Sequence, residues 1–529
     1  MPKQYDYIVV GAGSAGCALA NRLSECGRYQ VALLEAGPTD WYPWIHVPVG
    51  YFKTMGNPLT DWGYQTQPCA GLNGRSLPWP RGRGLGGSSS INGLLYVRGQ
   101  QQDYDDWANL GNEGWDWQQV LPHFVNSEDW SGKASSLRGK GGPLSVSETR
   151  LSRPIVDAWI EAAENLGYAR NDDYNGSTQE GVGLFQLTAR NGRRCSSAVA
   201  YLKPARKRAN LTILTRSRVE KLLLQNKRVT GVITQHGPIQ AKREVVLSSG
   251  AIGSPQLLML SGIGPHHELQ PHNIDTVHEL VGVGRNMQDH LQARPVYKCK
   301  TSTINTEINS LFKQALIGLE YLLKRTGPMT MAASLGTGFL STEFSPERPD
   351  IQFHIQPWSA DSPAEGPHKF DAFTASVLQL RPQSTGHISL VSDRFMDYPQ
   401  LHPNYLATEL DQKTLVAGIK LARQICQQEP LRSMIVDEFK PGKQVAEDDD
   451  AAILNWAREN STTIYHPTGT CKMGIDEEAV VDPRLRVHGI DGVRVADASI
   501  MPTIVSGNTN APAIMIGEKA AAMILEDAQ

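Results

Sequence analysis

The chain is long and nearly neutral. Its 529 residues exceed the ~250–300 residues at which a single hydrophobic core stops growing, so the length predicts two structural lobes. The balance of 51 Lys and Arg against 54 Asp and Glu gives a net charge of −3, and the charges are dispersed, which excludes an electrostatic nucleic-acid binder. No uncharged apolar run approaches the ~20 residues of a membrane-spanning helix. Composition therefore indicates a soluble, globular protein for which peripheral membrane contact stays open.

The cysteines suggest neither a metal site nor a disulfide framework. There are seven of them, an odd number, far apart and without a CxxC pair. The N-terminus lacks a basic segment followed by an apolar one, which a secretory leader would require. We therefore expect a cytoplasmic protein without a metal.

The first 35 residues carry a dinucleotide-binding pattern. A β-branched run, Tyr5 to Val10, ends in GAGSAG at 11–16 and leads into a helical pattern. A second apolar run, Val31 to Leu34, ends at Glu35. This order of strand, glycine turn, helix, strand and acid is typical of a βαβ unit that binds a dinucleotide.

Each glycine has an expected task in such a unit. Gly11 would permit the tight turn, Gly13 the close approach of a pyrophosphate, and Gly16 close helix packing, while Glu35 would bind the adenosine ribose. The alternative is a plain strand-to-helix turn with Glu35 as a surface acid. The unit alone does not distinguish NAD from FAD.

Three further segments contain a glycine-rich turn or end at an acidic residue. Residues 80–99 read PRGRGLGGSSSINGLLYVRG, a loop with many backbone N–H donors suited to a diphosphate or a flavin edge, or else a bland surface loop. Residues 245–255 read as a strand, a glycine turn and a helix start, and 493–496 as a short strand ending at Asp497.

The middle of the chain lacks such glycine-rich loops and shows helix and strand patterns instead. The segment 310–327 predicts one amphipathic helix, with Leu311, Ala315, Leu319 and Leu323 on one stripe and Gly327 as the stop signal. Residues 350–356 (DIQFHIQ) alternate apolar and polar, as a strand does. Further strand patterns predict an antiparallel sheet in a substrate-side lobe.

Seven ordered motifs resemble those of the glucose-methanol-choline (GMC) oxidoreductases over essentially the whole chain. The motifs are VGAGSAGCALANRLSE with LLEAG, PRGRGLGGSSSINGLLYVRG, GAIGSPQLLMLSGIGP, VGRNMQDH, YHPTGTCKMG, VVDPRLRVHGIDGVRVADASIMP and GNTNAPAIMIGEKAA. Within the family the chain is most similar to the choline-dehydrogenase-like and aliphatic alcohol dehydrogenase branch.

The resemblance implies an α/β fold, α+β overall, with a discontinuous Rossmann-like FAD-binding lobe and a substrate lobe containing an antiparallel sheet and helices. We expect residues 1–155, 200–295 and 462–529 in the first lobe, and 156–199 and 296–461 in the second.

The cofactor implied by the resemblance is FAD rather than NAD. The family's motifs carry cofactor contacts onto Gly11, Gly13, Ser14, Ala15, Gly16, Glu35, Arg83, Gly86, Gly87, Ser88, Asn92, Gly93, Leu94, Val219, Asp497, Ala498, Thr509 and Asn510. Some members attach FAD through a histidine within the GGxSxHN pattern. Here that place is Ile91, so we expect non-covalent FAD.

Oxidising an alcohol requires a base for the hydroxyl proton, and imidazole suits this task. Of the 14 histidines, His466 stands in YHPTGT, where Pro467 disfavours a helix and the turn residues can aim the ring into a cleft. The resemblance makes His466 the base, with hydride passing to flavin N5. Its partner is Asn508, which orients the oxygen, although Asn508 could also be a simple helix cap and Asn510 is the other choice.

Substrate and acceptor are less determined. Where choline-handling relatives carry a glutamate, this chain has Leu335, which disfavours choline. Met329, Met331 and Leu335 favour an apolar pocket for a primary alcohol, unless the methionines are core filler. His354, Gln356, Trp358 and Tyr465 could also line the pocket, which keeps a sugar or polyol open.

We expect a dehydrogenase that passes electrons to a quinone or another acceptor, with oxygen as the alternative, at or near the inner face of the membrane. Three other classes stay open: a GMC-fold hydroxynitrile lyase, an NAD-dependent dehydrogenase and a non-catalytic flavin-binding protein. The oligomeric state is not predicted.

Overall fold

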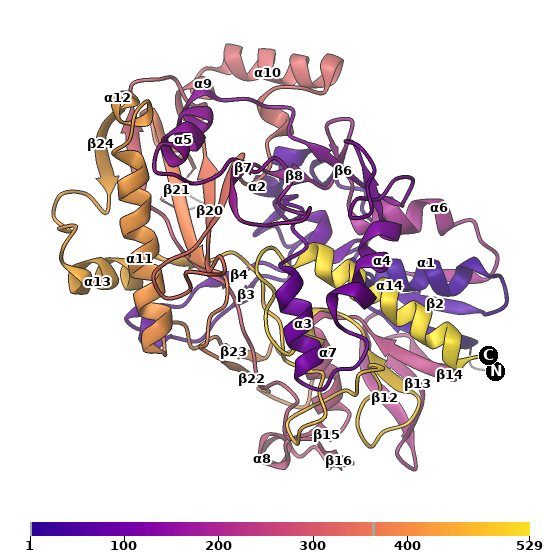
Figure 1. Cartoon of the computed structure of the whole chain (residues 1–529). Coiled ribbons are helices and arrows are strands. Elements are labelled where there is room, and N and C mark those ends of the chain that lie inside the picture. Colours follow the sequence, from indigo (N-terminus) through magenta and orange to yellow (C-terminus); the bar gives the residue numbers. More distant parts are fainter. Residues whose placement is uncertain (1–2, 362–365) are drawn as a thin grey trace.

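Two large sheets organise the computed structural model, which describes residues 3–361 and 366–529 (Figure 1). The first sheet has the strand order β11-β2-β1-β14-β13-β12, and β26 pairs with β14. Its strands are β1 (Lys3–Val10), β2 (Val31–Leu34), β11 (Leu211–Leu214), β12 (Val219–Gln225), β13 (Arg228–Thr234), β14 (Gly237–Leu247) and β26 (Val493–Val495). Three distant parts of the chain therefore build one sheet, as the family resemblance implied.

The parallel part of this sheet fixes where a ligand can bind. The pairs β11–β2, β2–β1, β1–β14 and β14–β26 are all parallel, so their carboxyl ends meet at one edge. The residues that follow these ends include Gly11, Glu35, Ser248 and Asp497. In open α/β sheets ligands bind outside these ends, which is where the predicted cofactor residues lie.

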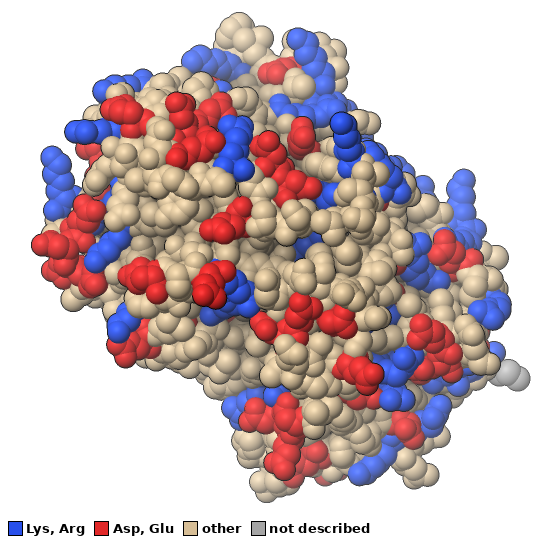
Figure 2. Space-filling model, viewed as in Figure 1, with Lys and Arg blue, Asp and Glu red and all other residues tan. Residues whose placement is uncertain are grey.

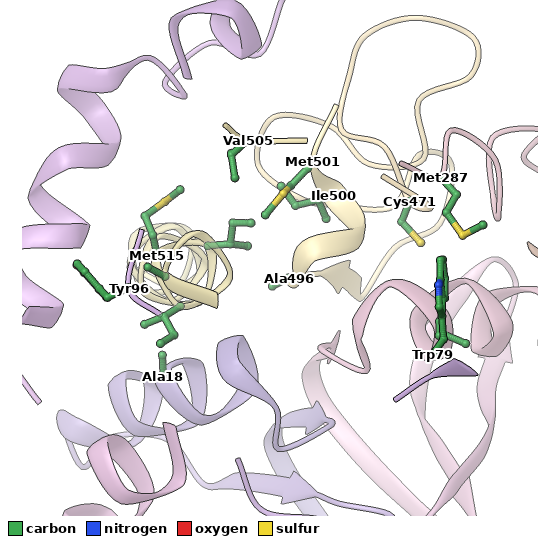
Figure 3. Close-up of a cluster of buried hydrophobic side chains, with 14 of the residues drawn as sticks. Ala18, Trp79, Tyr96, Met287, Cys471, Ala496, Ile500, Met501, Val505 and Met515 are labelled. Carbon is green, nitrogen blue, oxygen red and sulfur yellow. The ribbon is translucent and has the colours of Figure 1, made fainter. Parts of the chain in front are cut away.

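The C-terminal segment completes the first lobe. Helix α14 (Asn510–Asp527) packs against α1 (Ser14–Glu25), and Figure 3 shows Ala18 of α1 near Met515 of α14, with Ala496, Ile500 and Met501 in the adjoining segment. All of these residues are buried. The first and last helices thus share one core, and Asp527 and Ala528 near the end of the chain line one pocket together with Tyr7 of β1.

The second sheet is antiparallel and forms the other lobe. Its order is β24-β18-β21-β20-β19-β7, with β17 pairing with β21 and β25. The strands are β7 (Gly181–Leu184), β17 (Leu291–Ala293), β18 (Val296–Cys299), β19 (Gly336–Leu340), β20 (Ile351–Gln356), β21 (Ala372–Gln379), β24 (Ile435–Lys440) and β25 (Thr462–Thr463). Helices α5 (Pro154–Glu164) and α11 (Glu409–Cys426) cover one face.

The alternation predicted for 350–356 corresponds to β20, yet all six of its residues are buried. The polar side chains are buried because their face of the sheet looks onto the cavity between the lobes, which His354 and Gln356 line. Phe353 faces the other way and packs on Trp159 of α5.

The amphipathic helix predicted for 310–327 is shorter in the structure. Helix α10 spans Leu311–Lys324 and ends at Arg325, whose φ of 57° is left-handed. The chain therefore leaves the helix two residues before Gly327, because Arg325 itself supplies the left-handed turn that commonly ends helices. A short helix, α9 (Ile304–Glu307), precedes it.

The other elements are shorter or more peripheral. The helices are α2 (Tyr51–Thr54), α3 (Gln101–Asn109), α4 (Trp117–Ser127), α6 (Lys203–Ala205), α7 (Gly250–Leu260), α8 (His266–Leu269), α12 (Leu431–Met434) and α13 (Asp450–Asn460). The strands are β3 (Tyr64–Gln65), β4 (Pro78–Trp79), β5 (Glu128–Trp130), β6 (Leu144–Glu148), β8 (Gln186–Leu187), β9 (Ala189–Arg190), β10 (Arg193–Arg194), β15 (Ile263–Gly264), β16 (His278–Glu279), β22 (His387–Ser389) and β23 (Gln400–His402).

The visible surface carries both signs of charge in close mixture (Figure 2), as the composition suggested. Among the described residues, no helix combines the length and the apolarity that crossing a membrane requires.

Candidate active site

One cavity is lined by the carboxyl ends of the parallel strands, by the antiparallel sheet and by the C-terminal segment. It brings together most of the predicted site residues. Those that line it are Gly11, Gly13, Ser14, Ala15, Glu35, Gly87, Ser88, Asn92, Gly93, Val219, His354, Trp358, Tyr465, His466, Asp497, Ala498, Asn508, Thr509 and Asn510.

Seven of the predicted residues lie outside the lining: Gly16, Arg83, Gly86, Leu94, Met329, Met331 and Leu335. The Arg83 guanidinium lies 5.4 Å from the Trp62 ring. Met331 and Leu335 belong to the hydrophobic core, and the N–H of Leu335 donates to the carbonyl of Ile355 on β20. The expected apolar wall of methionine and leucine is therefore not a wall of the cavity, and Ala333 lines it instead.

The glycine turn has the shape of a cradle. A Cβ on Gly16 would lie 1.9 Å from the carbonyl oxygen of Gly11, and one on Gly11, at φ 103°, would lie 2.5 Å from the carbonyl oxygen of Ser248. A Cβ on Gly13 would meet only that oxygen, at 3.8 Å. Gly11 and Gly16 are therefore required by the protein's own packing, whereas Gly13 leaves open space toward the cavity.

Two helix N-termini meet at this cavity. Ser14 and Ala15 open α1, Thr509 and Asn510 open α14, and the Ser14 hydroxyl donates to the Asn510 side-chain oxygen over 2.8 Å. Neither helix has a side-chain cap hydrogen bond or an acidic residue in its first turn. The unpaired N–H groups and positive dipole ends of both helices thus suit a diphosphate and an electron-rich ring, which is the donor set that FAD requires.

Two buried carboxylates tie the loops of this edge together. Glu35 accepts from the N–H groups of Ala12 (3.0 Å), Gly37 (2.7 Å) and Gly84 (3.1 Å). Asp497 accepts from the Gly250 N–H (2.8 Å) and from hydroxyl and amide donors of Ser254 and Ser499. Burial raises the pKa of each carboxyl, and these hydrogen bonds oppose the rise. Glu35, predicted as a ribose ligand, thus also links the first glycine turn to the loop at residues 80–99 through hydrogen bonds.

The turn that carries His466 is held under strain. Tyr465 has a φ of 69°, an uncommon left-handed conformation for a bulky residue. The Arg81 guanidinium donates to the Tyr465 carbonyl (2.5 Å), and the His466 N–H donates to Asp289 (2.6 Å). Asp289 is itself fixed by the hydroxyls of Tyr405 and Thr463, each at 2.5 Å. This network aims the His466 ring into the cavity.

Three side chains from distant segments form a hydrogen-bonded row. His290 Nε2 lies 2.8 Å from the Leu380 carbonyl oxygen and must donate to it; the other nitrogen of neutral His290 therefore accepts. His290 Nδ1 lies 3.0 Å from His466 Nδ1, so His466 carries its proton on Nδ1. Its Nε2 is then an unprotonated base, 3.2 Å from the Asn508 amide nitrogen.

Burial keeps this row uncharged. It lowers the pKa of His290 to about 4, and it also lowers the pKa of His354, which lies outside the row, to about 3. The pKa of His466 lies well below its usual value, chiefly through burial and then through His290, His354 and Arg81. A neutral imidazole at neutral pH is the form that can accept a proton.

The far part of the cavity is aromatic and polar. Tyr51, Phe52 and Trp358 line it, and the Phe52 and Trp358 rings meet edge to face at 5.0 Å. The buried polar atoms without a partner among the described residues include Gln292 Oε1, Arg294 Nε, His354 Nε2 and Trp358 Nε1, and all four side chains line the cavity. Such groups are costly when unpaired, and they point to a ligand with polar atoms.

Sequence reasoning did not single out His290, Asp289, Arg81 or Arg294. His290 and Asp289 lie in the VGRNMQDH motif, which was noted only as part of the resemblance. The available signal was the adjacent Asp289-His290 pair at the end of that motif. Arg294 follows directly after β17 and carried no signal of its own.

Comparison with known proteins decides the family. The family models of the N-terminal and C-terminal parts of GMC oxidoreductases match residues 5–292 and 382–517. The chain is a GMC oxidoreductase. An "alcohol dehydrogenase [acceptor]" of Pseudomonas putida is 42% identical over 98% of this chain and 96% of that protein. An "oxygen-dependent choline dehydrogenase" of Brucella suis is also 42% identical, over 98% and 95%.

Solved GMC structures share the whole fold. Pyridoxine 4-oxidase from "Mesorbium loti" superimposes with a TM-score of 0.89 at 32% identity, covering 98% of this chain and 99% of that one. A formate oxidase variant from Aspergillus oryzae, described in connection with FAD modification, has a TM-score of 0.93 at 26% identity, covering 99% and 98%. This GMC oxidoreductase is therefore an FAD enzyme that acts on CH–OH groups.

Proposed function

We propose that this GMC oxidoreductase oxidises a primary alcohol to the aldehyde, with His466 Nε2 as the base. The observation that carries the proposal is the row from Leu380 through His290 and His466 to Asn508, which leaves an unprotonated nitrogen facing the cavity. Proton transfer by a positioned group contributes about 10²–10⁴-fold to rate. FAD, when bound, supplies the acceptor for the hydride that leaves the alcohol carbon.

Asn508 has the role of orienting the oxygen. Its amide nitrogen lies beside His466 Nε2, and its side-chain oxygen accepts from Gln352 over 3.4 Å. The Gln352 contact turns the amide so that its N–H groups face the base and the cavity. An alcohol oxygen placed between the two can take over the Asn508 N–H that now points at His466 Nε2, and the freed Nε2 can accept the proton of the alcohol.

The residues present suit non-covalent FAD. Gly13 and the first turns of α1 and α14 would hold the diphosphate, and Asp497 and Val219 line the same cavity. Ile91, which takes the place of the histidine used for attachment in some relatives, is buried and lines the cavity. An alkyl side chain offers no nucleophile for a bond to the flavin.

The charges of the cavity favour a neutral alcohol with a hydrogen-bond acceptor over a quaternary ammonium. Among the described residues that line it, the acids are Glu35 and Asp497, whose oxygens the protein's own donors occupy, and the bases are Arg81, Arg218 and Arg294. Asp361, which interacts electrostatically with Arg294, pairs with Lys440 and His368. An aromatic alcohol that carries an oxygen acceptor fits the aromatic wall and the unpaired donors of this region.

We further propose a quinone or similar acceptor for the electrons, with oxygen as the alternative. The P. putida relative is named for an unspecified acceptor and the Brucella relative for oxygen.

Anaerobic stopped-flow spectroscopy tests the proposal. His466→Ala should retain FAD but reduce it at least ~100-fold more slowly with benzyl alcohol. His267→Ala, which alters an exposed histidine (64% exposed side chain), is the matched control and should reduce flavin normally. Reduction of the His466→Ala flavin at the wild-type rate would overturn the assignment. Reoxidation of the reduced enzyme by oxygen and by a quinone, measured side by side, tests the acceptor.

A further inference from the structure

Helix α10 presents its apolar side chains to solvent. Leu311, Phe312 and Leu323 are 83%, 73% and 74% exposed, and Leu319 and Leu322 are 51% and 68% exposed. The helix has one buried residue, Tyr321, whose hydroxyl donates to the Gly192 carbonyl over 3.1 Å. A surface helix normally turns its apolar stripe toward the core, so α10 is inverted.

The exposed residues form one continuous stripe. At about 100° per residue, positions 311, 312, 315, 316, 319, 322 and 323 fall within an arc of about 140°. All seven are leucine, phenylalanine or alanine, and all are exposed. Ile317 and Tyr321 lie outside this arc and are half-buried and buried. We call these seven residues the α10 stripe. Large contiguous apolar patches of this kind mark interaction sites.

Exposed cations lie on one side of the stripe. Lys313 and Lys324 lie about 60° and 80° beyond one edge of the arc, with Glu320 between them and that edge, and Arg325 follows the helix. The Arg150 guanidinium donates to the Arg325 carbonyl. Glu320 is the acid of the helix, and it accepts from the Thr326 hydroxyl. Figure 2 shows blue side chains beside the tan surface at the top of the view, where α10 lies. This local excess of positive charge stands on a chain with a net charge of −3.

We propose that α10 docks the enzyme onto a lipid bilayer that contains anionic lipids. The stripe would enter the boundary between headgroups and acyl chains, and the lysines would contact the headgroups, as in interfacial amphipathic helices. A second copy of the chain fits less well, because a two-fold contact through the stripe would place the cations of one copy against the same cations of the other. Figure 1 shows α10 as a ridge outside both sheets, a shape suited to insertion.

The docked helix is linked to the cavity. The turn η7 (Pro328–Thr330) follows α10 and packs on η2 (Pro48–Gly50). The chain continues from η2 into Tyr51 and Phe52, which line the cavity. Docking through α10 thus brings this end of the cavity toward the lipid, from which an apolar alcohol or a quinone can enter.

Vesicle cosedimentation of the FAD-bound enzyme tests the proposal. The probes are vesicles of phosphatidylcholine with one quarter phosphatidylglycerol, and vesicles of phosphatidylcholine alone. The variant Leu319→Gln/Leu323→Gln replaces two exposed leucines of the stripe. The matched control is Val436→Gln/Ile475→Gln, which changes two residues that are 60% and 70% exposed elsewhere. Flavin content, thermal unfolding and alcohol oxidation with a soluble dye are measured in each variant. Both variants should match the wild type in all three measurements.

We expect the wild type and the control to sediment with the anionic vesicles, less at high salt, and the stripe variant to partition at least tenfold more weakly. Lys313→Gln/Lys324→Gln should lose most of the preference for anionic over neutral vesicles. Absence of wild-type binding, or equal binding by the stripe variant, would overturn the proposal. So would a wild-type dimer, detected by light scattering, that the stripe variant abolishes while vesicles bind neither protein.

Discussion

Replacing His290 tests whether this residue sets the tautomer of the catalytic base. In the wild type, His466 Nδ1 lies 3.0 Å from His290 Nδ1. The leucine of His290→Leu has a similar size but cannot accept the proton of His466 Nδ1. His466 can then place its proton on Nε2, the nitrogen that should act as the base. His290 does not line the cavity, so the change leaves the substrate surface intact.

The size of the effect follows from one buried hydrogen bond. Such a bond contributes about 0.5–1.5 kcal/mol, and ~1.36 kcal/mol corresponds to tenfold in rate. We therefore expect flavin reduction to slow by about 2- to 13-fold. The Leu380 carbonyl also loses its donor, and an unsatisfied buried group costs about 1–3 kcal/mol, so the variant should melt at a lower temperature.

The pH profile separates this role from a purely structural one. Besides burial, His290 lowers the pKa of His466, so its removal should raise that pKa. Because the base works in its neutral form, activity is lost as the pH falls through the pKa of His466. The acidic limb of the rate profile in His290→Leu should therefore move to higher pH.

The assay is anaerobic stopped-flow reduction between pH 5 and 9, with flavin content and thermal unfolding as checks. His290→Asn is the matched variant, because its side-chain oxygen can still accept from His466, and it should recover most of the rate. A His290→Leu enzyme with the wild-type rate and an unmoved acidic limb would refute the tautomer argument.

Three further predictions concern the cofactor and the substrate. Gly13→Val should weaken FAD binding at least ~tenfold by filling the open space above Gly13, with little change in the melting temperature of the apoprotein. Gly16→Ala should instead destabilise the fold, because its Cβ would lie 1.9 Å from the Gly11 oxygen. Flavin titration and thermal unfolding of both variants check this, and equal FAD affinity and equal melting temperature in the two variants would contradict it. Acid precipitation should release all flavin into the supernatant, and yellow colour in the washed pellet would show a covalent bond. Choline should be oxidised at least ~100-fold less efficiently, by kcat/KM, than benzyl alcohol, because the ammonium of choline and the Arg294 guanidinium repel each other. Arg294→Gln should reduce this difference in kcat/KM. A wild-type enzyme that prefers choline would refute the charge argument.

The sequence by itself determined the cofactor half of this protein. The turn at Gly11 to Gly16 and the strand ending at Glu35 lie within one short stretch, where spacing dictates geometry because neighbouring residues are joined by the chain itself. Sequence patterns also predicted His466 in its turn and placed Ile91 where some relatives attach FAD.

Only the tertiary structure decided what those residues meet. His290 and His466 are 176 positions apart, so the contact that sets the tautomer depends on how β17 and β25 pair. Met331 and Leu335 looked like pocket residues, but the pairing of the segment before β19 with β20 turns Leu335 into the core and leaves Ala333 at the cavity.

Helix α10 also shows what a sequence pattern leaves undecided. Its periodicity predicted an apolar stripe, and the stripe exists. A period fixes which side chains share a face, but not which way that face points, because orientation is set by what the rest of the fold packs against. Tyr321 anchors α10 by its other side, and the stripe faces outward.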